Sequence, residues 1–426
     1  MDNKRRQLIG CSAALAATVS VPGWARDSIH DSIGDKAHAN DAPHGAGSAQ
    51  KAARPQLGTS AAIDGNGRLW VAQTEAVEQA GGGPALANIL LAWSADGGKS
   101  WTKVGPVLAA PERVEANGEG RPKLAFGPRG QMYLTYTQPL DQPHTGHIRF
   151  ARSTDGGVSF SAPVTVQRDL AATGHRFDGI VTDRRGRIFV AWIDKRDGDA
   201  ARKAGRAYRG AALYYAVSGD EGASFGLDVK VADHCCECCR IALALTPNGD
   251  VAAMWRHVFA PNVRDHAMAI LVPSGRPGAL TRISFDDWRI DACPHHGPSL
   301  AFDARGRRHQ VWFTGGDERG GLYYAVAGPT GRAGKPVRLG GAQAGHGEVL
   351  AAGSAVAVVW KEFDGQATKV MLRLSSGNRP AWQERALVTT RGASDHPHLV
   401  SDGSAMWLVW RTEDEGVVVH RVEAAA

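Results

Sequence analysis

Short runs of alternating apolar and polar residues, separated by turns that contain glycine, follow one another from about residue 57 onward. One unit recurs: a polar or small residue, an alternating run, a tight turn, and a second run that ends in most copies at Trp or Tyr. Alternation with period two is typical of half-buried β-strands, and a glycine turn between two such runs indicates a hairpin. The copies cover 58–73, 121–136, 177–192, 240–255, 297–312, 346–360 and 396–410.

The spacing of these copies predicts the fold class. They end at Gln73, Tyr136, Trp192, Trp255, Trp312, Trp360 and Trp410, which lie 63, 56, 63, 57, 48 and 50 residues apart. A second hairpin follows each first one, so a full unit supplies four strands, and repeated four-stranded units build a β-propeller. We therefore predict an all-β protein, a β-propeller of four-stranded blades, with seven blades favoured and six as the alternative. The last unit has three strands, and a segment before Leu57 would supply the fourth and close the ring.

Three of the second hairpins contain a sharper motif, Ser-x-Asp-x-Gly-x-Ser-aromatic, centred on Asp96, Asp155 and Asp220. In such a turn the Asp bonds to nearby backbone, Gly takes the positive φ, and the aromatic ring packs under the hairpin. These turns resemble the Asp-boxes (BNR repeats) of the sialidase superfamily, and the resemblance covers the repeat framework of roughly residues 57–424. It implies a propeller fold, a structural role for the three Asp residues, and a functional face on the opposite side. Sialidases have six blades, which differs from the favoured count.

The N-terminus predicts export. A basic start at 4–6, an apolar run through Val21 and the small-x-small sequence 23–25 are typical of a signal peptide over residues 1–25, and Arg5-Arg6 resembles a twin-arginine signal. Residues 26–55 lack apolar periodicity and are predicted to be a disordered leader, followed by a single propeller domain over 56–426. No later segment is long and apolar enough to span a bilayer, so the expected location is periplasmic or secreted.

The net charge of +6 is spread along the chain without a basic tract, so the sequence gives no case for nucleic acid.

Cysteine chemistry concentrates in one stretch, residues 233–240, with the sequence Asp-His-Cys-Cys-Glu-Cys-Cys-Arg. Thiolates are the softest protein ligands and suit Cu(I) or Zn. An oxidising compartment also permits disulfides, for example from Cys293 to this stretch. Once Cys11 has left with the signal, an odd number of cysteines remains, so disulfides within one chain cannot use them all. Adjacent thiols can also reduce Cu(II), which leaves a redox use open.

The repeat places equivalent positions side by side at one mouth of the propeller channel. From the third unit onward, the residues where each first strand begins include a His or Cys: His175, Cys238, Cys239, His295, His296, His346 and His396. The fold would gather these residues around one axis. Thiolates beside neutral imidazoles favour copper, with zinc as the second choice.

A glycoside hydrolase or a carbohydrate-binding propeller with structural disulfides is the alternative, implied by the sialidase resemblance. That family uses an arginine triad, an acid/base Asp and a Tyr–Glu nucleophile pair whose Tyr lies late in the chain. Arg121, Arg176 and Arg240 stand where first strands begin and would suit an anion. The last tyrosines, Tyr323 and Tyr324, fall inside a strand pattern, so the nucleophile is missing and sialidase activity is not expected. A third class is an interaction scaffold whose disulfides clamp two blades.

We therefore predict an exported propeller that binds a thiophilic metal, copper first, for acquisition, buffering or delivery, with a membrane transporter or metallochaperone as partner. No catalytic residue is assigned, and enzymatic activity is left open. The soft ligands would be Cys235, Cys236, Cys238, Cys239 and Cys293, surrounded by His234, His295, His296, His175, His346 and His396.

Overall fold

The computed structural model describes residues 56–77, 85–292, 294–316, 319–328, 331–376 and 379–423. The predicted signal and leader, residues 1–55, and Cys293 lie outside this part of the chain. Within it the protein is almost entirely β, with 27 strands and one helix, α2 (Arg196–Lys203), between the second and third strands of the third unit. No helix in these ranges is long and apolar enough to cross a membrane.

Within each unit the strands pair antiparallel, each with its neighbour in sequence, as the hairpin pattern predicts. The first four units contain β1 (Thr59–Ile63), β2 (Leu69–Val77), β3 (Leu86–Ser94), β4 (Thr102–Pro106); β5 (Lys123–Phe126), β6 (Met132–Pro139), β7 (Gly146–Ser153), β8 (Val164–Thr165); β9 (His175–Thr182), β10 (Ile188–Asp194), β11 (Ala211–Ser218), β12 (Val229–Cys235); β13 (Ala242–Leu245), β14 (Val251–Phe259), β15 (Val263–Leu271), β16 (Thr281–Arg282). The remaining units contain β17 (Ser299–Phe302), β18 (Arg308–Thr314), β19 (Gly321–Ala327), β20 (Val337–Leu339); β21 (Ala344–Ala352), β22 (Ala355–Phe363), β23 (Thr368–Ser376), β24 (Arg379–Thr390); β25 (His398–Ser401), β26 (Met406–Thr412), β27 (Gly416–Arg421).

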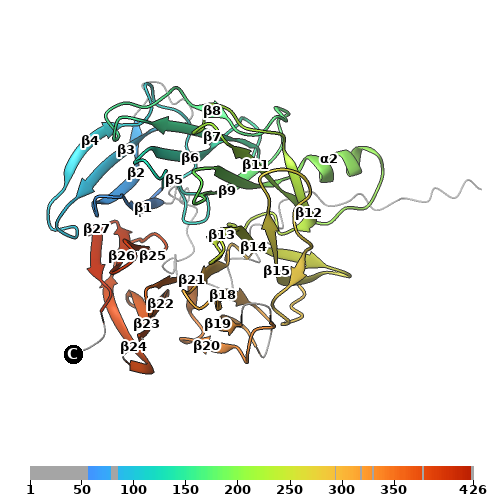
Figure 1. Ribbon diagram of the computed structural model, residues 1–426. Helices are drawn as coiled ribbons and strands as arrows, with labels where there is room; N and C mark the ends of the chain where they lie inside the picture. The colour runs from blue at the N-terminus through green and yellow to red at the C-terminus, as the bar shows by residue number, and fades with distance from the viewer. Residues whose placement is uncertain are drawn as a thin grey trace, which may run out of the picture.

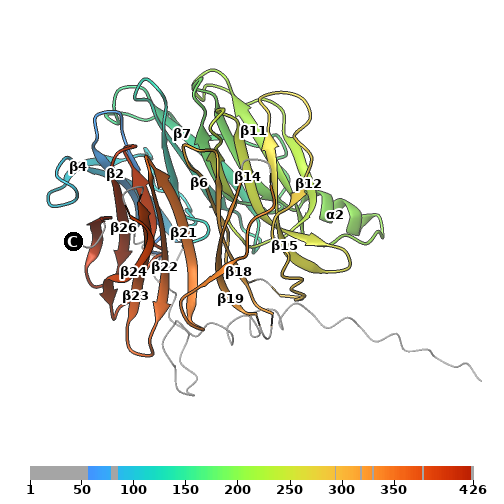
Figure 2. The ribbon, with the colours of Figure 1, turned by 60° about the horizontal axis from the view of Figure 1, so that its bottom comes forward.

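The first strands of the units form a closed ring. Each contacts the first strand of the next unit, from β1 through β5, β9, β13, β17 and β21 to β25, and β25 contacts β1. Figure 1 shows the units arranged around one centre, and Figure 2 shows the same molecule tilted. Where the ring closes, Nε2 of His398 lies 3.1 Å from the carbonyl oxygen of Ala61. The predicted all-β propeller fold is thereby confirmed. The count of seven blades stays a prediction, because the third and fourth units are hydrogen-bonded into a single eight-stranded sheet.

A large aromatic residue is buried in the second strand of every unit, and these rings form the core between neighbouring sheets. They are Trp70, Tyr136, Trp192, Trp255, Trp312, Trp360 and Trp410. The indole N–H groups also have partners: Trp192 Nε1 donates to Asp194 at 2.7 Å, and Trp360 Nε1 donates to Glu362 at 3.1 Å. A buried indole is stable when its N–H is bonded, so each repeat supplies both the apolar surface and a polar partner for it.

The three Ser-x-Asp-x-Gly turns share one hydrogen-bond pattern. In the third, Ser218 Oγ accepts from Gly222 N at 2.8 Å and donates to Asp220, whose carboxylate accepts from the backbone and the hydroxyl of Ser224 at 3.0 and 2.6 Å. The turns at Asp96 and Asp155 repeat these bonds. The bonds from Ser224 hold the pKa of Asp220 at about 2. The carboxylates therefore have a local structural task, which is to close hairpin turns.

One strand pairing joins the third and fourth units, Cys235 of β12 opposite His257 of β14. The His257 ring lies 4.4 Å from the ring of Phe259, and its Nδ1 accepts from Trp255 Nε1 at 3.4 Å. Burial lowers the pKa of His257 from its ordinary 6.5 to about 4. The imidazole therefore stays neutral in the folded protein at a pH where the unfolded chain takes up a proton.

We expect His257 to make the fold acid-sensitive between pH 6.5 and 4. In this pH range the unfolded state binds a proton at His257 and the native state does not. The free energy of unfolding should therefore fall by up to about 3 kcal/mol as the pH is lowered from 6.5 to 4. The substitution His257→Gln removes that contribution. Urea denaturation of both proteins between pH 4 and 8 measures the difference, and an equal pH dependence in the variant would contradict the assignment.

Candidate metal centre

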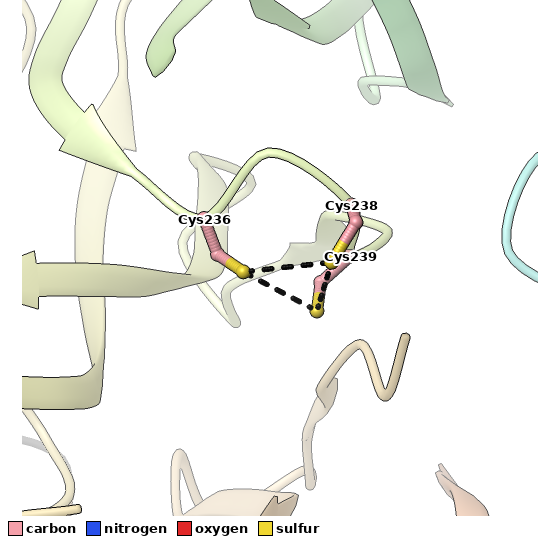
Figure 3. A group of neighbouring side chains, drawn as sticks. All are labelled: Cys236, Cys238 and Cys239. Atoms are coloured by element: carbon pink, nitrogen blue, oxygen red, sulfur yellow. Dashed lines mark hydrogen bonds between the residues drawn. The ribbon is translucent and has the colours of Figure 1, made fainter. Parts of the chain in front are cut away.

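Three cysteine side chains converge in the loop between β12 and β13. The Sγ atoms of Cys236, Cys238 and Cys239 form a triangle with edges of 3.7, 3.9 and 3.8 Å (Figure 3). The loop is held by a 2.9 Å hydrogen bond from Cys236 N to Arg256 O. All three residues are buried, within the apolar core that the third and fourth units share. We call these three residues the cysteine triangle.

The size of the cysteine triangle fits a bound ion. A metal–sulfur distance of about 2.3 Å in a tetrahedral site places the sulfurs about 3.8 Å apart. A disulfide requires two sulfurs about 2.05 Å apart, which is far shorter than any edge of the cysteine triangle. The three side chains would therefore hold a thiophilic ion with little rearrangement.

Positive charge surrounds the cysteine triangle. Arg264 Nη1 lies 3.7 Å from Cys236 Sγ. The thiols of Cys238 and Cys239, and then the guanidinium groups of Arg256 and Arg264, place the pKa of Cys236 well below its ordinary value. Burial raises the pKa of Cys239. The neighbouring thiols and the two arginines thus favour the thiolate form of Cys236, which is the form that binds metal.

The structure separates the other predicted ligands of this stretch from the cysteine triangle. Cys235 Sγ lies 3.9 Å from Ala232 O and is not part of the group. His234 takes a left-handed backbone conformation (φ 59°), and its Nδ1 lies 3.0 Å from Arg209 O. Glu237, between the cysteine pairs, forms an ion pair with Lys195 at 2.6 Å. Three of the five predicted soft ligands thus converge, while Cys293 lies outside the described residues.

A second group of predicted ligands gathers where other units begin. The imidazole rings of His296, His346 and His396 stack, with centroids 4.2 and 3.7 Å apart and planes within 20° of each other. Phe313 extends the stack at 4.3 Å from His296. Three units, the fifth to the seventh, supply these rings, so the fold does bring together histidines that are distant in sequence.

Glu119, which no ligand prediction included, lies beside this stack. Its Oε1 is 3.5 Å from His396 Nδ1 and 3.8 Å from His346 Nδ1. Glu119 precedes β5 at the position aligned with Cys238 and His295, so a search of that position for carboxylates as well as for His and Cys would have found it. We call Glu119, Arg240, His296, His346 and His396 the axial cluster.

Arg240 connects the axial cluster to the cysteine triangle, since it follows Cys239 directly. Its backbone N–H donates to Glu119 Oε2 and its Nη1 to Oε1, both at 2.8 Å. The backbone N–H of Gly297 donates to the same carboxylate at 3.0 Å. Burial opposes the charge of Glu119, but Arg240 and these bonds hold its pKa at about 2. Burial also lowers the pKa of His346 to about 4, so this imidazole is neutral at pH 7.

Two predicted histidines lie outside the axial cluster. His175 is fully buried, with Nδ1 3.0 Å from Gly146 O and Nε2 3.7 Å from Asp194. His295 is exposed and has a positive φ of 50°. Neither belongs to a group of converging ligands among the described residues.

The three arginines predicted to suit an anion are paired with carboxylates of the chain itself. Arg121 lies 3.5 Å from Asp395, Arg176 binds Glu115, and Arg240 binds Glu119, as the distances and bonds show. An incoming anion would have to displace these partners. Anion binding by the three arginines therefore stays a prediction.

Comparisons with known proteins match the fold and not the sequence. No family model and no curated protein matches the chain. The α-L-arabinofuranosidase Arb93A from Fusarium graminearum, in complex with an iminosugar inhibitor, aligns with a TM-score of 0.51 at 14% identity over 77% of this chain and 95% of its own. An ulvan lyase of polysaccharide lyase family 25 aligns at 0.51 and 12% identity, over 84% and 90%. At such low identity the likeness shows a shared fold alone.

The Glu119–Arg240 pair should be a major stabilising contact at the ring axis. Glu119→Gln leaves a buried guanidinium without its charged partner, and we expect a loss of about 3 kcal/mol in the free energy of unfolding. Asp141→Asn provides the control, because Asp141 is 91% exposed in its ion pair with Arg113. That change should cost less than about 1 kcal/mol. Denaturant titration measures both, and equal costs would refute the proposed importance of the buried pair.

Proposed function

We propose that this protein is an exported propeller that binds a thiophilic metal ion, with copper as Cu(I) first and zinc second, through Cys236, Cys238 and Cys239. The observation that carries the proposal is the cysteine triangle, whose three edges of 3.7, 3.9 and 3.8 Å match a thiolate-bound ion. Soft thiolates prefer Cu(I) and Zn²⁺ over hard cations.

The charges near the triangle favour Cu(I). Three thiolates around a monovalent ion carry a net charge of about −2, which is costly in a buried site unless positive groups offset it. Arg256, which is 1% exposed, and Arg264 supply that offset. Structural zinc sites generally take four protein ligands, and the described residues bring three sulfurs together. Zinc would require a further ligand, for which Cys293 was the sequence prediction.

The burial of the site bears on its task. Cys236, Cys238 and Cys239 are at most 4% exposed, so a bound ion would be shielded from solvent and from competing ligands. This favours holding the ion, as in buffering or protected delivery, over rapid exchange. The predicted export signal would place the site in the periplasm or outside the cell, where a transporter or metallochaperone would be the partner.

The fold comparisons favour a second candidate function, a carbohydrate-active or carbohydrate-binding propeller. One cavity of about 550 Å³, which we call the rim cavity, is lined by Phe285, Tyr323, Arg319, Arg332 and Lys335 together with one carboxylate, that of Asp286. Phe285 is 43% exposed, and the Arg332 guanidinium lies 4.1 Å from its ring centroid. Aromatic faces and cations together suit an acidic sugar. The catalytic candidates at the axis are weaker, because Glu119 is neutralised by Arg240.

Metal binding is tested by comparing neighbouring cysteines. We expect the reduced full-length protein to take up one Cu(I) per chain in competition with a chromophoric chelator. Cys236→Ser should weaken binding at least about a hundredfold by removing one of three converging ligands. Cys235→Ser is the matched control, since it removes an adjacent thiol that points elsewhere, and it should leave affinity unchanged. Full binding in Cys236→Ser, or equal loss in both variants, would overturn the site.

The carbohydrate candidate is tested with uronic-acid oligosaccharides. If the rim cavity binds acidic sugars, Phe285→Ala should weaken binding about tenfold or more, because the ring that holds the Arg332 guanidinium in place is lost. Leu170→Ala is the control, since Leu170 is an exposed apolar side chain (66%) outside the cavity. Calorimetric titration gives the affinity. Failure of the unmodified protein to bind or cleave any such glycan would eliminate this candidate.

A further inference from the structure

The axial cluster contains a second set of ligand atoms whose chemistry differs from that of the cysteine triangle. Glu119 offers a carboxylate oxygen, and His346 and His396 each offer a ring nitrogen; these three atoms all lie within 4.8 Å of one another. We propose that Glu119, His346 and His396 form a second metal site, which takes a divalent ion of borderline softness such as Zn²⁺ or Cu²⁺.

The distances suit such an ion. Metal–nitrogen and metal–carboxylate distances of about 2.0–2.2 Å place tetrahedral ligand atoms about 3.4 Å apart. The carboxylate oxygen of Glu119 is 3.5 Å from Nδ1 of His396 and 3.8 Å from Nδ1 of His346. These separations are long for direct hydrogen bonds and are close to those around a shared ion. Because the rings of His346 and His396 stack within 20° of parallel, binding one ion requires the two rings to tilt so that both lone pairs point at it.

The two ring nitrogens lack other partners. Nδ1 of His346 and Nδ1 of His396 are buried atoms with no hydrogen bond in the structure. Buried polar atoms are nearly always bonded, so two such atoms that face one carboxylate call for an explanation.

The backbone is shaped around these rings. A Cβ atom on Gly118 would lie 2.5 Å from atoms of the His396 ring, and one on Gly345 would lie 2.8 Å from Cε1 of His296. His346 itself has a positive φ of 52°, which is costly for a residue with a side chain. The loops therefore accept close approach and strain in order to place the imidazoles beside Glu119.

Arg240 limits the affinity of this site. Its Nη1 donates to the same Glu119 oxygen that faces the imidazoles, at 2.8 Å, so a divalent ion would lie near a guanidinium. The ion pair with Arg240 lowers the free-energy cost of burying the Glu119 carboxylate. The positive charge of Arg240 also repels a divalent cation bound next to it. The site should thus bind more weakly than three thiolates do. With three protein ligands, the ion would keep an open position for water or for a ligand oxygen.

The experiment isolates this site by removing the other. The full-length Cys236→Ser protein, which lacks the cysteine triangle, is titrated with Zn²⁺ by calorimetry and with Co²⁺ by absorbance. We expect one ion per chain and weak d–d bands without sulfur-to-metal charge transfer. Adding His396→Gln should reduce Zn²⁺ affinity at least about tenfold. His295→Gln in the same background is the matched control, because His295 is the exposed neighbour of His296 and should leave binding unchanged.

Each outcome decides the proposal. No Zn²⁺ uptake by folded Cys236→Ser protein, unchanged affinity in His396→Gln, or an equal loss in His295→Gln would overturn it. His346→Gln serves as the second variant if His396→Gln does not fold, with circular dichroism as the check. Every protein in this series has lost one of the three converging thiols, and the absence of sulfur-to-metal charge transfer shows that Cys238 and Cys239 do not hold the ion, so the result is separate from Cu(I) binding by the cysteine triangle.

Discussion

The buried carboxylate of Glu119 is the contact on which the centre of this propeller depends. A closed ring of first strands brings the loops of every unit to one axis. Polar groups that are buried there would lack hydrogen-bond partners unless one group served several of them. Glu119, from the second unit, accepts the backbone N–H groups of Arg240 and Gly297 and the guanidinium of Arg240. It also faces two imidazoles. The Glu119 side chain thereby links five units. Its negative charge can be buried only because the positively charged Arg240 is fixed opposite it.

The Glu119–Arg240 ion pair connects the two candidate metal sites, so a movement at one would be transmitted to the other. Arg240 follows Cys239 in the chain, so the residue that holds the Glu119 carboxylate is also the end of the loop that carries the cysteine triangle. Any shift of that loop on binding an ion would move the Arg240 backbone N–H, which lies 2.8 Å from Glu119. Soft thiolates therefore lie next to imidazoles and a carboxylate because the fold brings them together. No single sequence motif contains all of these ligands.

Much of the fold was predictable from the sequence, because its signal is periodic. The aromatic residues that end the repeats, such as Trp192 and Trp360, are the buried core of the sheets, and within each unit the strands of the described residues form the expected hairpins. Repetition makes the prediction of strands more reliable, because a strand that is misplaced in one unit can be corrected by comparison with the other units. It also predicted that histidines from distant units, His296, His346 and His396, would meet.

The details of the site were not predictable, since they depend on where single side chains point. Four cysteines within five residues look equivalent in sequence, yet a positive φ at His234 and the strand pairing of Cys235 turn that cysteine away from its neighbours. Glu119 was missed because a carboxylate in a loop is ordinary, and only its burial against Arg240 distinguishes it. Periodicity fixes which residues reach the axis, while loop dihedral angles decide which of them converge.

The two proposed functions require different surroundings, and the burial of the ligands helps to choose between them. The arabinofuranosidase and the ulvan lyase with a similar fold act on carbohydrates, and recognition of a carbohydrate requires an open surface with aromatic and charged groups, as proposed for the rim cavity beside Phe285. The cysteine triangle is closed to any sugar, since its residues lie within the apolar core of two sheets. A small ion is the kind of ligand that fits there. The two proposed functions would therefore use different parts of the molecule. Evidence for metal binding would neither support nor exclude carbohydrate binding, because the residues differ.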